Sequence, residues 1–323
     1  MLWIFFLSCS FVNGFSGRPA DPSDQSEIVV TVPEGATARS MGSVLEAAGA
    51  IDNADGFRWY VRINKEGGCI KAGDHAVQRS MSHAELIAAL CGAPIVTAEP
   101  FTVLEGWRIR EIDASLAEKG LIKPGEYAAL AKTPSAFRAP YPLPPDSLEG
   151  YLFPETYMIE RDRFEPRAFI QRQLNLFNER FMAKHQDGFG KRSLEDIVIM
   201  ASMIVREEPT ERQRPLVAGI LWKRIDSRWN LGVDATSRYE LPKWNDRRAF
   251  LKKLRDPKDQ YNTRLRPGLP PTAIGNPDLS SLEAAAAPVD SPYWYYLHDS
   301  DGVLHPSRSV NEHEQYRKQY NVY

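Results

Sequence analysis

The chain has 323 residues, of which 43% are hydrophobic and 25% are charged, and its formal net charge is -2. This length fits one large domain or two ordinary ones, and the composition excludes an intrinsically disordered protein. The 40 Lys and Arg residues are scattered without a polybasic block. The sequence therefore predicts a folded protein with no nucleic-acid partner.

Three cysteines are too few for a disulfide framework and lack the spacing of metal ligands. A Cys69–Cys91 bridge remains open if the protein folds in an oxidising compartment. Two buried free thiols are the favoured interpretation, because free Cys is among the most buried residue types.

The N-terminus is apolar from Met1 to Leu7 and carries no charge before Arg18. This run is shorter than the ~20 residues of a spanning helix, and it is typical of a signal peptide that lacks a basic start. We expect residues 1–18 to be an export signal or a membrane anchor, whose beginning could be truncated. A disordered apolar tail is the alternative. Residues 19–26 read as a polar linker.

Residues 27–100 predict a compact α+β unit. Strands are expected over 27–35 and 69–77, and helices over 37–51, 56–64 and 81–92. Thr37 and Ser82 are suitable N-caps, and Glu85 completes a capping box with Ser82.

Residues 101–323 predict a second, larger α+β domain. Helices are expected over 108–120, 124–133, 165–181, 194–208, 211–226, 279–288 and 309–320, and an aromatic strand over 292–299. The segments 138–159, 230–242 and 261–278 are rich in Pro, Gly or Asn but not of low complexity, so we expect ordered loops or irregular structure there.

The stretch "DIVIMASMIVREEP" at 196–209 is an apolar helix that ends in two acids and a proline. Residues 197, 200, 201 and 204 share one helical face, and that face continues to Glu207 and Glu208. Burial would raise the pKa of a carboxyl there, as a general acid requires. From the spacing alone, the favoured interpretation is a structural acid paired with Arg206 or another base.

Other catalytic motifs are missing from the sequence. It contains no serine elbow, phosphate-binding loop, dinucleotide fingerprint or H-E-x-x-H pattern. His305 and His313 lie eight residues apart but lack a third ligand. No cofactor and no metal are therefore predicted.

The order of several longer motifs is more specific. "LEGYLFPETY" (148–157), "MASMIVREE" (200–208), "NLGVDATSRYE" (230–240), "YNTRLRPGLPPTAIGNP" (261–277) and "SPYWYYLHDSDGVLHPSRSVNEH" (291–313) follow one another along the chain. In this order they resemble the endolytic murein transglycosylase (YceG-like) family, from about Ile28 to the C-terminus.

The resemblance implies a single N-terminal anchor, a LysM-like subdomain at 27–100 and a catalytic domain at 101–323. The family's catalytic Glu follows an Ala-Ser pair by six residues from the Ala, which places it on Glu207. With this resemblance we expect Glu207 to be the catalytic acid and Glu208 to be its neighbour. The implied reaction cleaves the β-1,4 bond between N-acetylmuramic acid and N-acetylglucosamine and leaves a 1,6-anhydro end.

The resemblance also implies a set of substrate-binding residues within these motifs. They are Glu149, Tyr151, Arg224, Asp234, Thr236, Tyr261, Asn262, Thr263, Asn276, Ser307 and His313. The implied partners are peptidoglycan glycan strands and cell-wall synthesis enzymes in the membrane. The implied location is the periplasmic face of the inner membrane, held by a single anchor, or an exported form.

Departures from the family pattern keep two other functions open. "GVDAT" at 232–236 lacks the usual Gln and Pro, Lys223 replaces the usual Asn, and Pro306 stands where an aromatic is common. A non-catalytic peptidoglycan-binding protein is therefore one alternative. A muramidase-type hydrolase, which would leave reducing ends, is the other.

Overall fold

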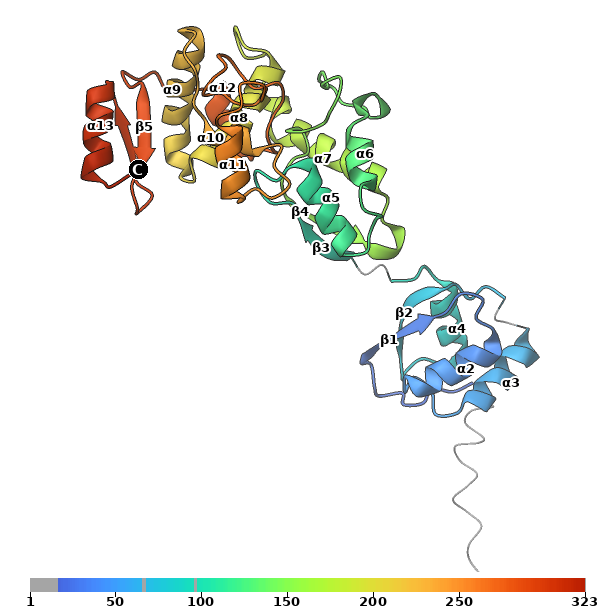
Figure 1. The fold of residues 1–323 in the computed structure, drawn as a ribbon. Helices are drawn as coiled ribbons and strands as arrows, with labels where there is room; N and C mark the ends of the chain where they lie inside the picture. Colours follow the sequence, from blue (N-terminus) through green and yellow to red (C-terminus); the bar gives the residue numbers. More distant parts are fainter. Residues whose placement is uncertain (1–16, 66–67, 96–97, 323) are drawn as a thin grey trace, which may run out of the picture. The chain divides into compact units, whose positions relative to one another are not determined.

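The computed structural model describes residues 17–65, 68–95 and 98–322. These residues form a mixed α+β structure, which confirms the α+β part of the predicted fold class (Figure 1). The chain divides into two compact units, Met1–Ala98 and Glu99–Tyr323. The predicted signal or anchor segment lies almost wholly outside the described residues. Among the helices that are described, none is both long and apolar enough to cross a membrane.

The first unit combines a two-stranded sheet with three helices. Its elements in order are β1 (Glu27–Val32), α2 (Ala38–Ala47), α3 (Ala54–Asn64), β2 (Gly73–Gln78) and α4 (His83–Cys91). The strands β1 and β2 pair antiparallel, with Glu27 opposite Gln78. The core between sheet and helices is aliphatic around the Phe57 ring. The two predicted N-caps are confirmed, because Thr37 and Ser82 each form a capping box.

The expectation of free buried thiols is wrong. Cys69 and Cys91 form a disulfide that joins the segment before β2 to the end of α4. Cys69 is exposed, so it is not the buried small hydrophobe that composition alone suggested. The bridge depends on where β2 and α4 meet in the fold, which cysteine spacing does not reveal.

The second unit begins with a short sheet and a group of helices. Its first elements are β3 (Ala98–Thr102), α5 (Ile109–Glu118), α6 (Glu126–Ala131), β4 (Thr156–Glu160) and α7 (Pro166–Arg180). β3 and β4 pair with each other. β4 occupies the end of the segment predicted as a loop, so the sequence missed this strand.

The remaining elements include one buried helix on which three other helices pack. They are α8 (Leu194–Glu207), α9 (Arg214–Asp226), α10 (Asp234–Arg238), α11 (Arg247–Lys253), α12 (Leu279–Ala286), β5 (Tyr295–His298), β6 (Leu304–Ser307) and α13 (Val310–Gln319). α8 packs on α9, α10 and α12, and its residues from Ile197 to Ile204 are all buried. β5 and β6 form an antiparallel hairpin on which α13 packs.

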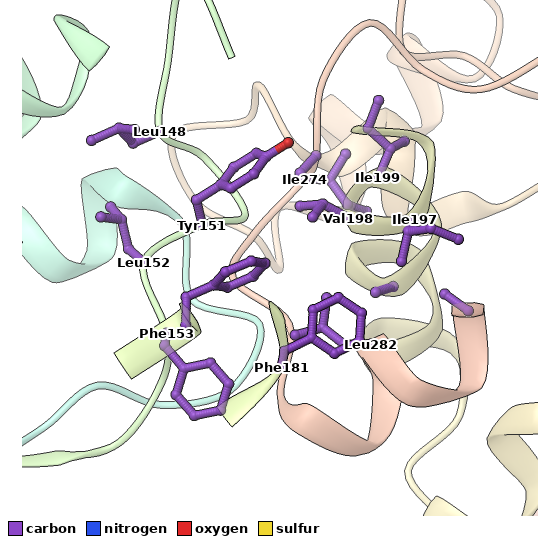
Figure 2. Close-up of a cluster of buried hydrophobic side chains, with 14 of the residues drawn as sticks. Leu148, Tyr151, Leu152, Phe153, Phe181, Ile197, Val198, Ile199, Ile274 and Leu282 are labelled. Carbon is purple, nitrogen blue, oxygen red and sulfur yellow. The ribbon is translucent and has the colours of Figure 1, made fainter. Parts of the chain in front are cut away.

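The core of this unit joins α8 to the loop motifs. Figure 2 shows the ring of Tyr151 pointing toward Ile274 and Val198, which come from the 261–278 loop and from α8. Gly150 lies where the backbone of the 148–152 segment comes close to α8 and to the 261–278 loop. A Cβ at this position would come within 2.6 Å of both Val198 and Ala273, and the φ of Gly150 is 93°. Only glycine fits such a position without strain.

Three further elements, besides β4, differ from the sequence-based expectation. α10 lies in the segment predicted as irregular, and α11 and β6 were not predicted at all. α10 and α11 are too short for helical periodicity to be visible, and Phe250 is the one buried residue of α11. β6 contains Pro306, which counts against a strand, and only one partner strand pairs with it.

Candidate active site

Helix α8 delivers two consecutive acids at its C-terminal end. Ser193 caps its start through a capping box with Asp196. Glu207 is its last helical residue, and Glu208 turns into an extended conformation with φ -128° and ψ 104°. The residue before a proline avoids the helical region, so Pro209 accounts for this ending.

The two acids have different surroundings. Glu207 retains partial exposure, and its Oε2 accepts a hydrogen bond from the Tyr296 hydroxyl at 3.0 Å. Glu208 is 0% exposed, accepts the backbone N–H of Thr210 at 2.7 Å and lies 3.0 Å from Nε2 of His298. Of the two carboxylates, only Glu207 is reachable from solvent.

The electrostatic setting favours the protonated form of Glu207. Burial raises the pKa of its carboxyl, and the negative charge of Asp234 raises it further. The Tyr296 hydroxyl, the His298 ring and the backbone N–H of Ala235 oppose this shift of the pKa. A carboxyl with a raised pKa holds its proton closer to neutral pH and can donate it as a general acid.

Arg206, the partner expected from the spacing alone, faces elsewhere. Its guanidinium donates to the carbonyl of Gly106 and lies 4.1 Å from the ring centre of Trp244. The interpretation of Glu207 as an acid paired with Arg206 is therefore wrong. Because Arg206 points toward Gly106 and Trp244, Glu207 has no adjacent cation from helix α8.

The strand β5 supplies two site residues that the sequence analysis missed. Tyr296 and His298 are two positions apart, so they share one face of the strand. Tyr296 contacts Glu207, and His298 contacts Glu208. The alternation in "YYLH" was the available signal, but nothing in it indicates which residues the strand faces.

Asp234 and Arg264 form an ion pair near Glu207. Nε of Arg264 lies 2.6 Å from Oδ1 of Asp234, and both side chains are about half exposed. The charge of Glu207 in turn affects the pKa of Arg264. Asp234, predicted to bind substrate, is thus brought together with Glu207, and Arg264 is a neighbour that the sequence analysis did not select.

Thr236 and Thr263 are buried and join two loops. Their hydroxyls are 3.1 Å apart, and both bond to the backbone of Val233. Gly232, with φ 67°, donates its N–H to the carbonyl of Thr263. The altered "GVDAT" loop therefore has its polar contacts within the chain, and the two threonines hold it in place.

Arg224 and Lys223 fix the approach to β5. Arg224 donates to the carbonyls of Trp294 and Leu231. Lys223 donates to the carbonyls of Ser291 and Tyr293. Both residues therefore hold the segment that leads into Tyr296.

The other expected substrate-binding residues of the central motifs serve the core. Tyr151 is 3% exposed and packs among aromatic rings. Glu149 is 4% exposed and accepts the backbone N–H of Ile109 at 3.0 Å and the Tyr239 hydroxyl at 3.1 Å. Asn276 is fully buried and accepts the N–H groups of two residues in the 148–152 segment. Direct substrate contact is not supported for these three.

The last four expected residues lie in two further places. The hydroxyl of Tyr261 lies 2.8 Å from that of Thr272, and Asn262 is buried against backbone carbonyls. Ser307 is buried, and its Oγ lies 3.5 Å from Nδ1 of His313. No contact joins these four to Glu207 among the bonds of the described residues. Nor does the described part of the chain gather three His, Cys, Asp or Glu side chains as a metal ion would need.

The chain and its fold have counterparts among known proteins. The model of the YceG-like family matches residues 30–319, so the chain belongs to the YceG-like family. A crystal structure of a YceG-like protein from Listeria monocytogenes has a TM-score of 0.60 and 25% identity, over 90% of this chain and 99% of that one.

Two relatives carry a functional name. The endolytic murein transglycosylase of Bacillus subtilis is 25% identical over 319 residues, which cover 94% of this chain and 87% of that protein. The endolytic murein transglycosylase of Streptococcus pneumoniae is 24% identical over 97% of this chain. The chain spans 63% of the length of that second relative.

Proposed function

We propose that this protein is an endolytic murein transglycosylase with Glu207 as its catalytic acid. One observation carries this proposal. A partly exposed carboxyl with a raised pKa stands at the end of a buried helix, in a chain of the YceG-like family. Relatives that cover most of the chain bear the name of this activity.

In the proposed reaction the substrate supplies its own nucleophile. Glu207 protonates the oxygen that leaves toward N-acetylglucosamine, so the bond from that oxygen to the anomeric carbon breaks. The 6-hydroxyl of the same N-acetylmuramic acid attacks the anomeric carbon, and Glu207 takes its proton. The product is a 1,6-anhydro ring, no water is consumed, and Glu207 ends protonated as it began.

A second candidate reaction is hydrolysis of the same bond. Ordinary glycosidases use a second carboxylate to activate water or to form a covalent intermediate. Asp234 is close enough for its charge to raise the pKa of Glu207, which favours this candidate. Its ion pair with Arg264 argues against it, because a carboxylate held by a guanidinium is a weaker base.

A purely binding protein is less well supported. Burying a carboxyl beside a second acid costs stability, and such a cost is commonly retained where the group is used. The "GVDAT" departure, which motivated this alternative, leaves the loop hydrogen-bonded to Thr263 through the backbone N–H groups of Gly232 and Val233.

The proposed place of action is the cell envelope. The disulfide between Cys69 and Cys91 favours an oxidising compartment, because cytosolic disulfides are rare. The proposed partners are glycan strands and membrane-bound cell-wall synthesis enzymes. We also propose that the first unit, whose order β1, α2, α3, β2 fits a LysM-like subdomain, contacts the glycan.

Mass spectrometry of muropeptides tests the proposal. The full chain and its Glu207→Gln variant are incubated with uncrosslinked glycan strands, and the ends of the fragments are identified. We expect internal fragments with anhydro ends from the wild type alone. Reducing ends would establish the hydrolase, and strand binding without cleavage by either protein would leave a binding protein.

A further inference from the structure

The two acids at the end of α8 are each held by one residue of β5. The hydroxyl of Tyr296 donates to Oε2 of Glu207 at 3.0 Å, and Nε2 of His298 lies 3.0 Å from Oε2 of Glu208. Burial and the nearby carboxylate raise the pKa of Tyr296 well above its usual range. The phenol therefore keeps its proton and faces Glu207 as a donor.

We propose that Tyr296 is the positioning residue of Glu207, holding Oε2 so that Oε1 is the oxygen that delivers and recovers the proton. This inference rests on the proposed function of Glu207. A proton on Oε2 would compete with the phenol for the same side of the carboxyl, whereas no side chain of the described residues donates to Oε1. The backbone N–H of Ala235 also stabilises the charged carboxylate, but it leaves the carboxyl without a second side-chain donor. A carboxyl with one oxygen fixed presents the other in a single orientation, and orientation is a large part of catalytic rate.

The position of the phenol is itself set from both sides. Before β5, Arg224 donates to the carbonyl of Trp294 at 2.8 Å. Within the hairpin, Tyr296 lies opposite Pro306 of β6. After it, the contact of His298 with the fully buried Glu208 joins the end of the strand to α8. These contacts of the hairpin thus fix the position of the Tyr296 hydroxyl beside Glu207.

Several charged or titratable groups surround Glu207 besides the phenol. They are Glu208 on the same helix end, His298 on β5, Asp234 on α10, Arg224 on α9 and Arg264 in the 261–278 loop. The Tyr296→Phe variant changes none of these charges, because the phenol is neutral. Any change in the titration of Glu207 in this variant therefore reports the lost hydrogen bond.

The test compares Tyr296→Phe with Tyr295→Phe as a matched control. Tyr295 lies on the other face of the strand, where its ring stacks on His313 at 5.3 Å. For each protein, kcat/KM on uncrosslinked glycan strands is measured against pH. The hydrogen bond favours the charged carboxylate, so its loss raises the pKa of Glu207. Because a general acid works while protonated, the basic limb of the kcat/KM profile, where activity falls as the pH rises, moves to higher pH.

For Tyr296→Phe we expect the basic limb to rise by about half a unit to one unit. The plateau of kcat/KM should fall by about tenfold to a hundredfold, with the loss in kcat, because the carboxyl is less well oriented. Tyr295→Phe should leave both the limb and the plateau as in the wild type. A lower plateau with an unmoved limb would overturn the inference, and so would wild-type kinetics.

A second measurement keeps this result separate from the proposed function. Titration of the carbon-13 carboxyl signal of Glu207, assigned with Glu207→Gln, gives its pKa without any substrate. An upward shift in Tyr296→Phe supports the hydrogen bond even if the wild type cleaves no glycan, in which case the proposed function fails alone. If Tyr296→Phe does not fold, fluorotyrosine at position 296 is a stronger donor and should lower the limb. An unmoved limb there would overturn the inference.

Discussion

Two acids of the second unit share most of their chemistry, yet only Glu207 is proposed to be catalytic. Glu149 and Glu207 both lie at apolar surfaces, and burial is the largest cause of the raised pKa in each. For Glu149 the pKa rises to about 7. Each accepts a hydrogen bond from a tyrosine, Tyr239 in the first case and Tyr296 in the second.

The two carboxyl groups differ in how many hydrogen-bond donors surround them and in how exposed they are. Glu149 is 4% exposed and also accepts the backbone N–H of Ile109, while Asn276 lies against its Oε1. Glu207 accepts one side-chain hydrogen bond, from the phenol, the backbone N–H of Ala235 also acts on it, and it keeps partial exposure. A raised pKa therefore does not separate a structural acid from a catalytic one. We propose that the distinction lies in whether a carboxyl oxygen is accessible to substrate.

The largest effect should come from Glu207→Gln. The amide keeps the shape of the side chain but carries no transferable proton, so we expect cleavage of glycan strands to fall by about 10²- to 10⁴-fold. Thermal unfolding should change little, because the amide is uncharged, matches the carboxyl in size and can still accept the hydrogen bond of Tyr296. The measurement is the rate of appearance of new glycan ends by mass spectrometry.

Glu208→Gln is the matched control for this prediction. It replaces the neighbouring acid, which is 0% exposed and bonded to His298. We expect a smaller loss of activity together with a loss of stability, the reverse of Glu207→Gln. If Glu208→Gln were inactive and stable while Glu207→Gln stayed active, the assignment of the two acids would be exchanged.

The next largest effect concerns stability at Glu149. Its pKa in the folded protein is about 7, above the ordinary value of 4.5, so the folded state binds more protons between these pH values. The contribution of Glu149 to stability is therefore fully present below pH 4.5 and declines as the pH rises through 7. The decline amounts to about 3 kcal/mol.

Glu149→Gln should remove this pH dependence. At pH 5 we expect the variant to be less stable by about 1–3 kcal/mol, because the amide cannot satisfy all the donors around it. The difference should narrow as the pH rises to 8, since only the wild type develops a buried charge. Denaturant unfolding at the two pH values measures this. A constant difference would mean that Glu149 titrates normally.

The sequence predicted the helix α8 well, but it predicted the roles of the two acids at its end only in part. A run of apolar residues closed by Pro209 was enough to predict a buried helix that ends at two acids. The residues alone favoured a structural acid paired with Arg206 or another base, and only the family resemblance favoured Glu207 as the catalytic acid. Exposure decides between Glu207 and Glu208, and that depends on the rest of the fold.

The partners of these acids could not be predicted, because they are distant in sequence. Tyr296 is 89 residues from Glu207, and Asn276 is 127 residues from Glu149. The motif around Glu149 resembles a binding motif when read alone. In the structure it is the close approach of Gly150 to α8 that makes this segment part of the core.

A smaller effect on stability is expected from Tyr239→Phe, which should differ from Tyr296→Phe in its pH profile. Tyr239→Phe removes the hydroxyl that donates to Glu149 at 3.1 Å. We expect the protein to lose about 1 kcal/mol of stability, the net value of one such hydrogen bond. The basic limb of kcat/KM should stay where it is, in contrast to Tyr296→Phe. A moved limb would show that Glu149, and not only Glu207, titrates in catalysis.

The smallest effect should come from Arg264→Gln. Arg264 neutralises Asp234, whose charge raises the pKa of Glu207. Without the guanidinium, Asp234 acts on Glu207 unopposed, so the basic limb should rise by about a few tenths of a unit. The shift is small because both side chains are about half exposed and screened by water, and added salt should shrink it further.

Arg266→Gln provides the control, since Arg266 is an exposed cation of the same loop that bonds to the carbonyl of Pro257. We expect its limb to match the wild type at every salt concentration. If both variants moved the limb equally, general surface charge would explain the effect. If Arg264→Gln instead moved the basic limb of the kcat/KM profile to lower pH, Asp234 would be acting on the substrate itself, as hydrolysis requires. Glu207 would then differ from Glu149 also in having a second catalytic carboxylate beside it.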